Sequence, residues 1–81
     1  MLYDVTFPKL TAKTEKGMLV SWLKNVGDFI EKDEVLYEVE TDKAVHEIEC
    51  PYSGIVTKHY QPEGTVLYLN DLVAQIEEAS L

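Results

Sequence analysis

The chain has 81 residues, 46% of them hydrophobic, so it is long enough for one small folded domain and too apolar to be disordered. Its 15 acidic and 7 basic residues give a formal net charge of −8, which disfavours nucleic-acid binding because phosphate backbones are repelled. No apolar run approaches the roughly 18 residues of a membrane span and no basic-then-apolar leader opens the sequence, so we expect neither membrane insertion nor a targeting segment.

Short strand-like stretches follow one another along the chain, and no ten-residue stretch shows a helical stripe. The sequence predicts strands over residues 2–7, 18–23, 28–30, 35–40, 44–50, 55–60, 65–68 and 72–77. Turn-forming glycine, asparagine and aspartate residues separate many of these stretches. We therefore expect an all-β domain with no significant helix.

An internal repeat with an offset of 37 residues runs through these stretches. The anchors of the repeat are Gly17 with Gly54, Gly27 with Gly64, Asp33 with Asn70, and Glu40 with Glu77. We expect positive φ angles in the turns at Gly27 and Gly64 and left-handed turn sites at the Asp33 and Asn70 pair. Two copies of a β-meander cannot each bury a face alone. The predicted fold is therefore a flattened β-barrel or sandwich of two roughly four-stranded antiparallel sheets, related by a pseudo-twofold axis.

The repeat also suggests which residues pack inside. The predicted core residues are Val20, Trp22, Leu23, Leu36, Val39, Ile48, Val56, Val66, Val73 and Ile76. His59 matches Trp22 in the repeat, so we expect it to pack rather than to catalyse. Cys50 is the single cysteine, which excludes an internal disulfide and indicates a reducing compartment; we expect it to be a buried, inert thiol.

A lysine stands in a short polar turn between two of the predicted strands. Thr41 and Asp42 can bond back to the nearby backbone and stabilise a tight reversal after residue 40. Lys43 then lies at the tip of a hairpin, where a large enzyme can reach it. This arrangement suits a carrier of a covalently attached group better than a catalytic pocket. The alternative is an ordinary solvated turn lysine.

A metal centre is the remaining catalytic possibility that the residues suggest. His46 lies beside Glu47 and Glu49, but on a strand its side chain points away from both carboxylates. The spacing therefore argues against metal ligation, and we expect neither a metal site nor catalytic residues.

Several short motifs resemble those of the lipoyl domains of 2-oxo acid dehydrogenase complexes. The matching segments are Pro8-Lys9-Leu10, Glu15-Lys16-Gly17, Val20-Ser21-Trp22, Gly27-Asp28, Glu38-Val39-Glu40-Thr41-Asp42-Lys43-Ala44, Glu47-Ile48, Pro51 and Gly54-Ile55-Val56. The resemblance extends from about Tyr3 to Glu77. It implies a barrel-sandwich hybrid fold, with a lipoyl domain over residues 1–78 and the start of a linker or tail at 79–81.

The resemblance also implies a function for the hairpin lysine. Lys43 would carry lipoic acid in amide linkage and act as a swinging arm that shuttles acyl groups and reducing equivalents. Asp42 and Ala44 would complete the attachment turn, and the modifying enzyme would recognise Glu40 and Thr41. The domain itself would be a monomeric, non-catalytic carrier within a dihydrolipoamide acyltransferase.

Partners and location follow from the same resemblance. The expected partners are a lipoate ligase or a lipoyl/octanoyl transferase, a thiamin-dependent 2-oxo acid decarboxylase, the acyltransferase core and dihydrolipoamide dehydrogenase. The expected location is the cytoplasm of a prokaryote or the mitochondrial matrix. Thr14 and Lys16 depart from the family pattern in the loop 11–16, which contributes to recognition by the decarboxylase, so the resemblance does not identify the complex.

Two other functions remain open. A biotin carboxyl carrier domain shares the fold and also uses a hairpin lysine, but its lysine is normally flanked by methionines, whereas Asp42 and Ala44 stand here. The chain could also be an unmodified barrel that acts as an interaction module.

Overall fold

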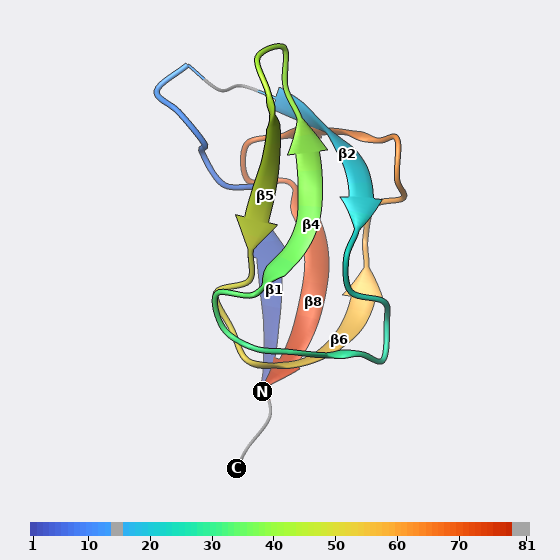
Figure 1. The fold of residues 1–81 in the computed structure, drawn as a ribbon. Coiled ribbons are helices and arrows are strands. Elements are labelled where there is room, and N and C mark those ends of the chain that lie inside the picture. The colour runs from blue at the N-terminus through green and yellow to red at the C-terminus, as the bar shows by residue number, and fades with distance from the viewer. Residues whose placement is uncertain (14–15, 79–81) are drawn as a thin grey trace.

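A computed structural model describes residues 1–13 and 16–78, in which eight strands and no helix occur (Figure 1). The strands are β1 (Leu2–Thr6), β2 (Lys16–Trp22), β3 (Phe29–Ile30), β4 (Val35–Glu40), β5 (Val45–Glu49), β6 (Gly54–His59), β7 (Val66–Tyr68) and β8 (Leu72–Glu78). They form two four-stranded antiparallel sheets, β1-β8-β6-β3 and β5-β4-β2-β7. The predicted all-β sandwich is confirmed, and the predicted strand ranges agree with these bounds to within two residues.

Two expectations fall outside the described residues. These are the departure from the family pattern at Thr14 and the linker at 79–81. Within the residues that are described, no helix is long and apolar enough to cross a membrane.

The pairing register shows the pseudo-twofold axis directly. Met18 pairs with Glu40 between β2 and β4, and Ile55 pairs with Glu77 between β6 and β8, which is the same pairing shifted by one repeat. Both ladders have a register shift at the same place, between residues 19 and 21 in one and between 56 and 58 in the other. The expected positive φ angles are confirmed at Gly27 (97°), Gly64 (93°), Asp33 (74°) and Asn70 (70°). The duplication therefore includes backbone detail as well as strand order.

Two aromatic rings that the repeat relates lie against each other. Trp22 and His59 stack with ring centroids 3.7 Å apart and an interplanar angle of 4°. His59 Nε2 lies 2.9 Å from the carbonyl oxygen of Lys24, and Trp22 Nε1 donates to the carbonyl oxygen of Gln61 at 3.1 Å. The packing role expected for His59 is confirmed.

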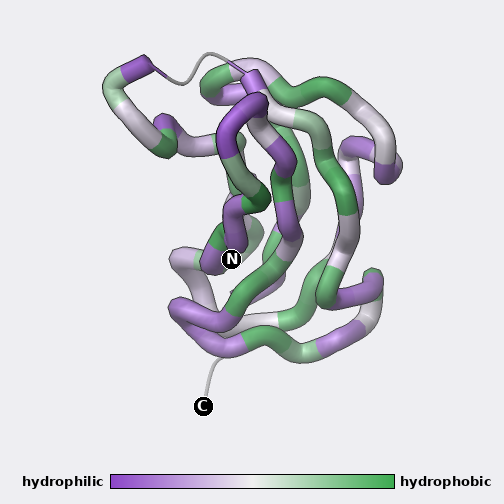
Figure 2. The backbone as a smooth tube through the Cα atoms, turned by 45° about the horizontal axis from the view of Figure 1, so that its top comes forward, coloured by the Kyte–Doolittle hydropathy of each residue, from purple (hydrophilic) through white to green (hydrophobic). Residues whose placement is uncertain are grey.

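The core between the sheets contains most, but not all, of the predicted residues. Six of the ten are buried: Leu36, Val39, Ile48, Val56, Val73 and Ile76. Trp22 is half-buried and packs against them. The prediction is wrong for three residues, since Val20 is 39%, Leu23 45% and Val66 45% exposed. In Figure 2, hydrophobic and hydrophilic stretches alternate along the strands, as expected for strands with one buried face.

Two of the three errors have one physical cause, which is the register of the strands. Val20 lies at the bulge of β2, so Leu19 takes the inward position in its place. In β7, Leu67 pairs with Gly17 and faces the core, which turns Val66 outward. Leu23 lies just beyond the end of β2. The buried residues that the sequence did not identify as core are Val5, Phe7, Leu19, Ile30, Tyr37, Leu67 and Ala74, and the burial expected for Cys50 is confirmed.

The hydroxyl of Tyr37 is a weak point of this core. The side chain is fully buried, its hydroxyl has no hydrogen-bond partner among the described residues, and burial raises its pKa well above the ordinary value of 10. A buried unsatisfied polar group costs about 1–3 kcal/mol. We expect Tyr37→Phe to raise the free energy of unfolding in urea by about 1 kcal/mol, since phenylalanine keeps the aromatic ring beside Trp22.

Tyr60→Phe is the control for this prediction. The Tyr60 hydroxyl donates to Asp4 and accepts from Gln75, so its removal should bring no gain in stability. A loss of stability in Tyr37→Phe would contradict the assignment.

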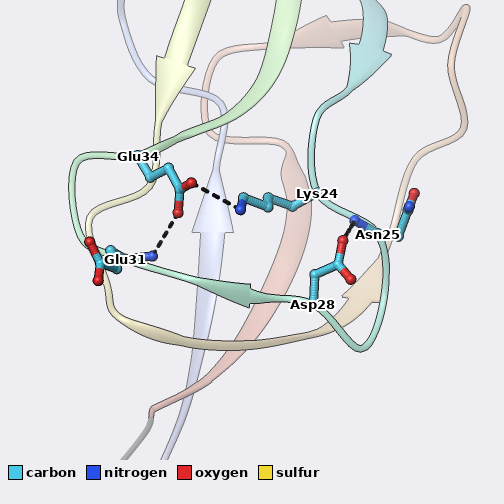
Figure 3. A network of polar contacts seen from close by, with 5 residues as sticks. All are labelled: Lys24, Asn25, Asp28, Glu31 and Glu34. Carbon is cyan, nitrogen blue, oxygen red and sulfur yellow. Dashed lines mark hydrogen bonds and ion pairs between the residues drawn. The ribbon is translucent and has the colours of Figure 1, made fainter.

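An ion pair lies at the end of the molecule where the chain termini lie (Figure 3). Lys24 Nζ is 2.9 Å from Glu34 Oε2, and Glu34 Oε1 accepts from the backbone N–H of Glu31 at 3.0 Å. The hydrogen bond from Glu31 and the interaction with Lys24 lower the pKa of Glu34 below its ordinary value of 4.5. The stabilisation is therefore fully present above pH 4.5 and is lost as the pH falls through the lowered pKa.

This contact predicts a pH-dependent effect. We expect Glu34→Gln to lower the melting temperature at neutral pH, and the difference from the unmodified chain to disappear in acid, below the lowered pKa of Glu34. Glu31→Gln is the matched control, since Glu31 joins this network through its backbone N–H. An equal loss at both pH values would show that the charge of Glu34 is not the cause.

Candidate functional site

The turn at residues 41–44 lies at one end of the molecule. It joins β4 to β5 and projects beyond both sheets, while the N-terminus and the last described residue of β8 lie at the opposite end (Figure 1). The backbone N–H of Glu78 donates to the carbonyl oxygen of Met1 at 2.9 Å, which holds the two terminal strands together. The hairpin is therefore separated from the chain termini by the length of the sheets.

Thr41 organises the turn. Its backbone N–H donates to the carbonyl oxygen of Ala44 at 2.9 Å and closes the hairpin. Its Oγ1 accepts from the backbone N–H groups of Lys43 and Ala44 at 3.3 and 3.4 Å, which is the behaviour expected of a threonine at a turn. The side chain of Thr41 therefore fixes the backbone on which Lys43 stands.

The residues predicted for attachment are placed together by this turn. Asp42, Lys43 and Ala44 are all exposed, and Glu40 is exposed at the end of β4. Thr41 is half-buried beneath them. The amine of Lys43 is thus presented on an ordered backbone at the tip of the hairpin, where an external enzyme can reach it.

His46 has a role that the sequence did not reveal. It pairs with Val39 on the half-buried side of β5, and its Nε2 lies 3.3 Å from Thr41 Oγ1. Glu47 and Glu49 are exposed on the other side, as the strand alternation predicted. His46 therefore braces the turn through Thr41. The alternation of β5 placed its side chain correctly, but its contact depends on how the turn closes.

The structure also places the side chains of the metal and cysteine candidates in the described part of the chain. Across residues 1–13 and 16–78, no cluster of three or more His, Cys, Asp or Glu side chains could hold a metal ion. Cys50 is fully buried, its Sγ donates to the carbonyl oxygen of Tyr52 at 3.2 Å, and burial raises the pKa of the thiol. A thiol in this environment is a poor nucleophile.

A shallow groove of about 440 Å³ lies beside the hairpin. Its lining joins the hairpin to the loop that precedes β2, and consists of Thr11, Lys13, Lys16, Thr41, Asp42, Lys43 and His46. Three of the seven lysines of this acidic chain meet there. The fold therefore brings the loop at residues 11–13 and Lys16 to the candidate site, although they lie about 30 residues earlier in the sequence.

Comparison with known proteins agrees with this geometry. A biotin/lipoyl family model, described as "Biotin-requiring enzyme", matches residues 3–76. The lipoyl domain of the 2-oxoglutarate dehydrogenase complex from Azotobacter vinelandii superposes with a TM-score of 0.75 at 25% identity, over 95% of this chain and 98% of that one.

Curated relatives are larger than this chain. The dihydrolipoyllysine-residue acetyltransferase components of pyruvate dehydrogenase complexes from Staphylococcus aureus and Staphylococcus epidermidis are 38% identical to it over 77 residues. The match covers 95% of this chain but only 18% of each relative. The similarity therefore concerns one domain of those proteins.

Proposed function

Because this chain belongs to the biotin- and lipoyl-attachment family, we propose that Lys43 is the residue to which lipoic acid is attached as an amide. The domain then acts as a swinging-arm carrier of acyl groups and reducing equivalents between the active sites of a 2-oxo acid dehydrogenase complex. Its parent chain is a dihydrolipoamide acyltransferase, and the domain contributes no catalytic residue of its own. We assign the carrier domain to residues 1–78.

The observation that supports this proposal most is the placement of Lys43. Its side chain is exposed at the tip of the hairpin, and the backbone beneath it is closed by the bond between Thr41 and Ala44. Asp42 and Ala44 flank it where a biotin carrier normally has methionines, which favours lipoic acid. A lipoyl group at this position supplies redox and acyl-transfer chemistry through its dithiolane.

The residues of this chain provide position and not catalysis. An amine does not form an amide with a free carboxylic acid without activation, so attachment requires a dedicated ligase or transferase that supplies an activated lipoyl group. A short flexible tether would hold the carrier near its partner sites at an effective concentration on the order of millimolar. The partners of this function are the decarboxylase, the acyltransferase core and dihydrolipoamide dehydrogenase.

Intact mass spectrometry tests the proposal. The domain is incubated with a lipoate ligase, lipoate and ATP, and the modified residue is located by peptide fragmentation. We expect one lipoyl increment at Lys43. A biotin increment after incubation with a biotin ligase, biotin and ATP would support the biotin carrier instead, and no increment in either reaction would support the unmodified interaction module.

The second step of the test concerns the complex. Lipoylated domain is offered to thiamin-dependent decarboxylases for pyruvate and for 2-oxoglutarate, and reductive acylation is followed with labelled substrate. Acylation by one of them identifies the complex that is served. Failure with both would leave attachment in place but contradict a role in these two complexes.

A further inference from the structure

A row of three exposed apolar side chains and one carboxylate crosses the outer face of the sheet that carries the hairpin. The register places Val66 beside Met18, Met18 beside Glu40, and Glu40 beside Val45, so that the row crosses all four strands of this sheet. Val66 is 45%, Met18 38% and Val45 54% exposed. Apolar side chains that lie together on a solvated face are candidates for an interaction surface.

The internal repeat supplies a comparison within the same molecule. The related row on the other sheet consists of Phe29, Ile55, Glu77 and Leu2, and it lies toward the end with the chain termini. Both rows consist of two apolar residues, one glutamate and a third apolar residue, in the same order. A matched surface is therefore available at the opposite end of the domain, away from Lys43.

The two sheet faces differ around these rows. Val20, which is 39% exposed at the bulge of β2, corresponds to Thr57, which bonds to Gln75. Tyr68, which is 55% exposed in β7, corresponds to Glu31. At both positions the apolar residue belongs to the hairpin side, so the apolar surface extends further beside Lys43 than beside the termini. The repeat also relates Val26 to Glu63, and in this pair the apolar residue does not belong to the hairpin side. These two residues lie in the loops after β2 and β6, however, and not on either sheet.

Unpaired acidic side chains border the hairpin-side row. Glu38 lies directly opposite Glu47 between β4 and β5, an arrangement that is unfavourable for like charges. Among residues 1–13 and 16–78, the one ion pair is Lys24 with Glu34, so no lysine of the described chain neutralises Glu38 or Glu47. A partner with basic side chains around an apolar centre would complement this face.

We propose that this hairpin-side face, formed by Met18, Val20, Val45, Val66 and Tyr68 with Glu38, Glu40 and Glu47, is the docking surface for the enzyme that attaches the lipoyl group. That enzyme contacts it through an apolar patch bordered by lysine or arginine. The proposal rests on attachment at Lys43 and adds the surface through which the attaching enzyme binds.

The distance from the row to the lysine favours the attaching enzyme over the decarboxylase. The pair formed by Glu40 and Val45 is the last one before the turn, so this end of the row is within about 10 Å of Lys43 along the strand. Met18 and Val66 follow one and two strands further across the sheet. An enzyme that acylates Lys43 must enclose the bare amine and therefore cover the base of the hairpin. The decarboxylase instead reacts with the dithiolane at the far end of the attached arm, so its active site lies further from this row.

The test compares two double variants at positions that the repeat relates, one variant for each row. Met18→Thr with Val66→Thr changes the hairpin-side row, and Ile55→Thr with Phe29→Thr changes its counterpart. Threonine suits a strand, so both variants should fold, which thermal unfolding checks. The reaction is ATP-dependent: Nζ of Lys43 displaces AMP from lipoyl adenylate, an amide bond forms, and the amine releases a proton.

We expect the hairpin-side variant to lose about tenfold in kcat/KM with a lipoate ligase, mainly through KM, as when an apolar anchor is removed from an interface. The counterpart variant, Ile55→Thr with Phe29→Thr, should keep the kcat/KM of the domain without substitutions. Equal kcat/KM values for the three proteins would overturn the inference, as would a defect confined to reductive acylation of fully lipoylated variants. Absence of lipoylation in the domain without substitutions would contradict the proposed function itself. Failure of the docking proposal and failure of the proposed function are therefore distinguishable.

Discussion

Moving the lysine by one residue, as Lys43→Ala with Ala44→Lys, is expected to reduce lipoylation by about a hundredfold or more, because the acceptor amine leaves the position that an enzyme of this kind must enclose. Position 44 adjoins Val45, whose side chain faces outward, so a side chain at 44 starts toward the opposite face. The backbone closure between Thr41 and Ala44 is unaffected by side-chain identity at 43 and 44. Intact mass after a fixed time with a lipoate ligase measures the effect.

The reciprocal exchange, Asp42→Lys with Lys43→Asp, is the companion variant. Both exchanges preserve the composition and the formal charge of −8, so a defect cannot be assigned to electrostatic steering by net charge. Equal melting temperatures would show that the fold is kept. Normal modification of both variants would show that the enzyme requires a lysine near the turn but no particular register.

The largest effect on stability is expected at Gly54. A Cβ atom added there would clash with the backbone carbonyl oxygen of Glu77 in β8. Because β8 is held between β1 and β6, its backbone cannot withdraw without breaking one of the two ladders. We expect Gly54→Ala to lower the free energy of unfolding by about 3 kcal/mol, at the upper end of overpacking costs. Urea denaturation followed by far-ultraviolet circular dichroism would measure it.

Gly17→Ala is the control that the repeat provides, since Gly17 occupies the corresponding position in the first copy. There the added Cβ would clash with the Val39 side chain, which has some freedom to adjust, rather than with a carbonyl group. We therefore expect a smaller loss than for Gly54→Ala. Equal losses would show that the identity of the clashing atom does not control the cost.

The hairpin and its lysine could be predicted from the sequence because their determinants are local. Thr41 and Asp42 favour a reversal by bonding to adjacent backbone groups, and strand-like runs lie on both sides of them. The repeat likewise depends on residues at one fixed interval, such as Gly27 and Gly64, whose positive φ angles are required by the turns themselves. Neither prediction required knowledge of which strands pair.

The details of the core and of the site surroundings could not be predicted in the same way. Val20 and Val66 were expected inside, but a bulge in β2 and the register of β7 turn them outward. A shift of one residue reverses the facing of a strand residue, and hydrophobic alternation alone does not locate such shifts. The same two residues became part of the proposed docking face.

The amino-acid sequence by itself determined the all-β class, the duplicated meander and the exposed position of Lys43, because turn chemistry and strand period act over a few neighbouring residues. Only the tertiary structure decided the rest. The support of Thr41 by His46, the arrival of Lys13 and Lys16 beside the hairpin, and the apolar row across the sheet all depend on pairings between distant segments. Such pairings are set by packing of the whole core, so no short stretch of the chain contains them.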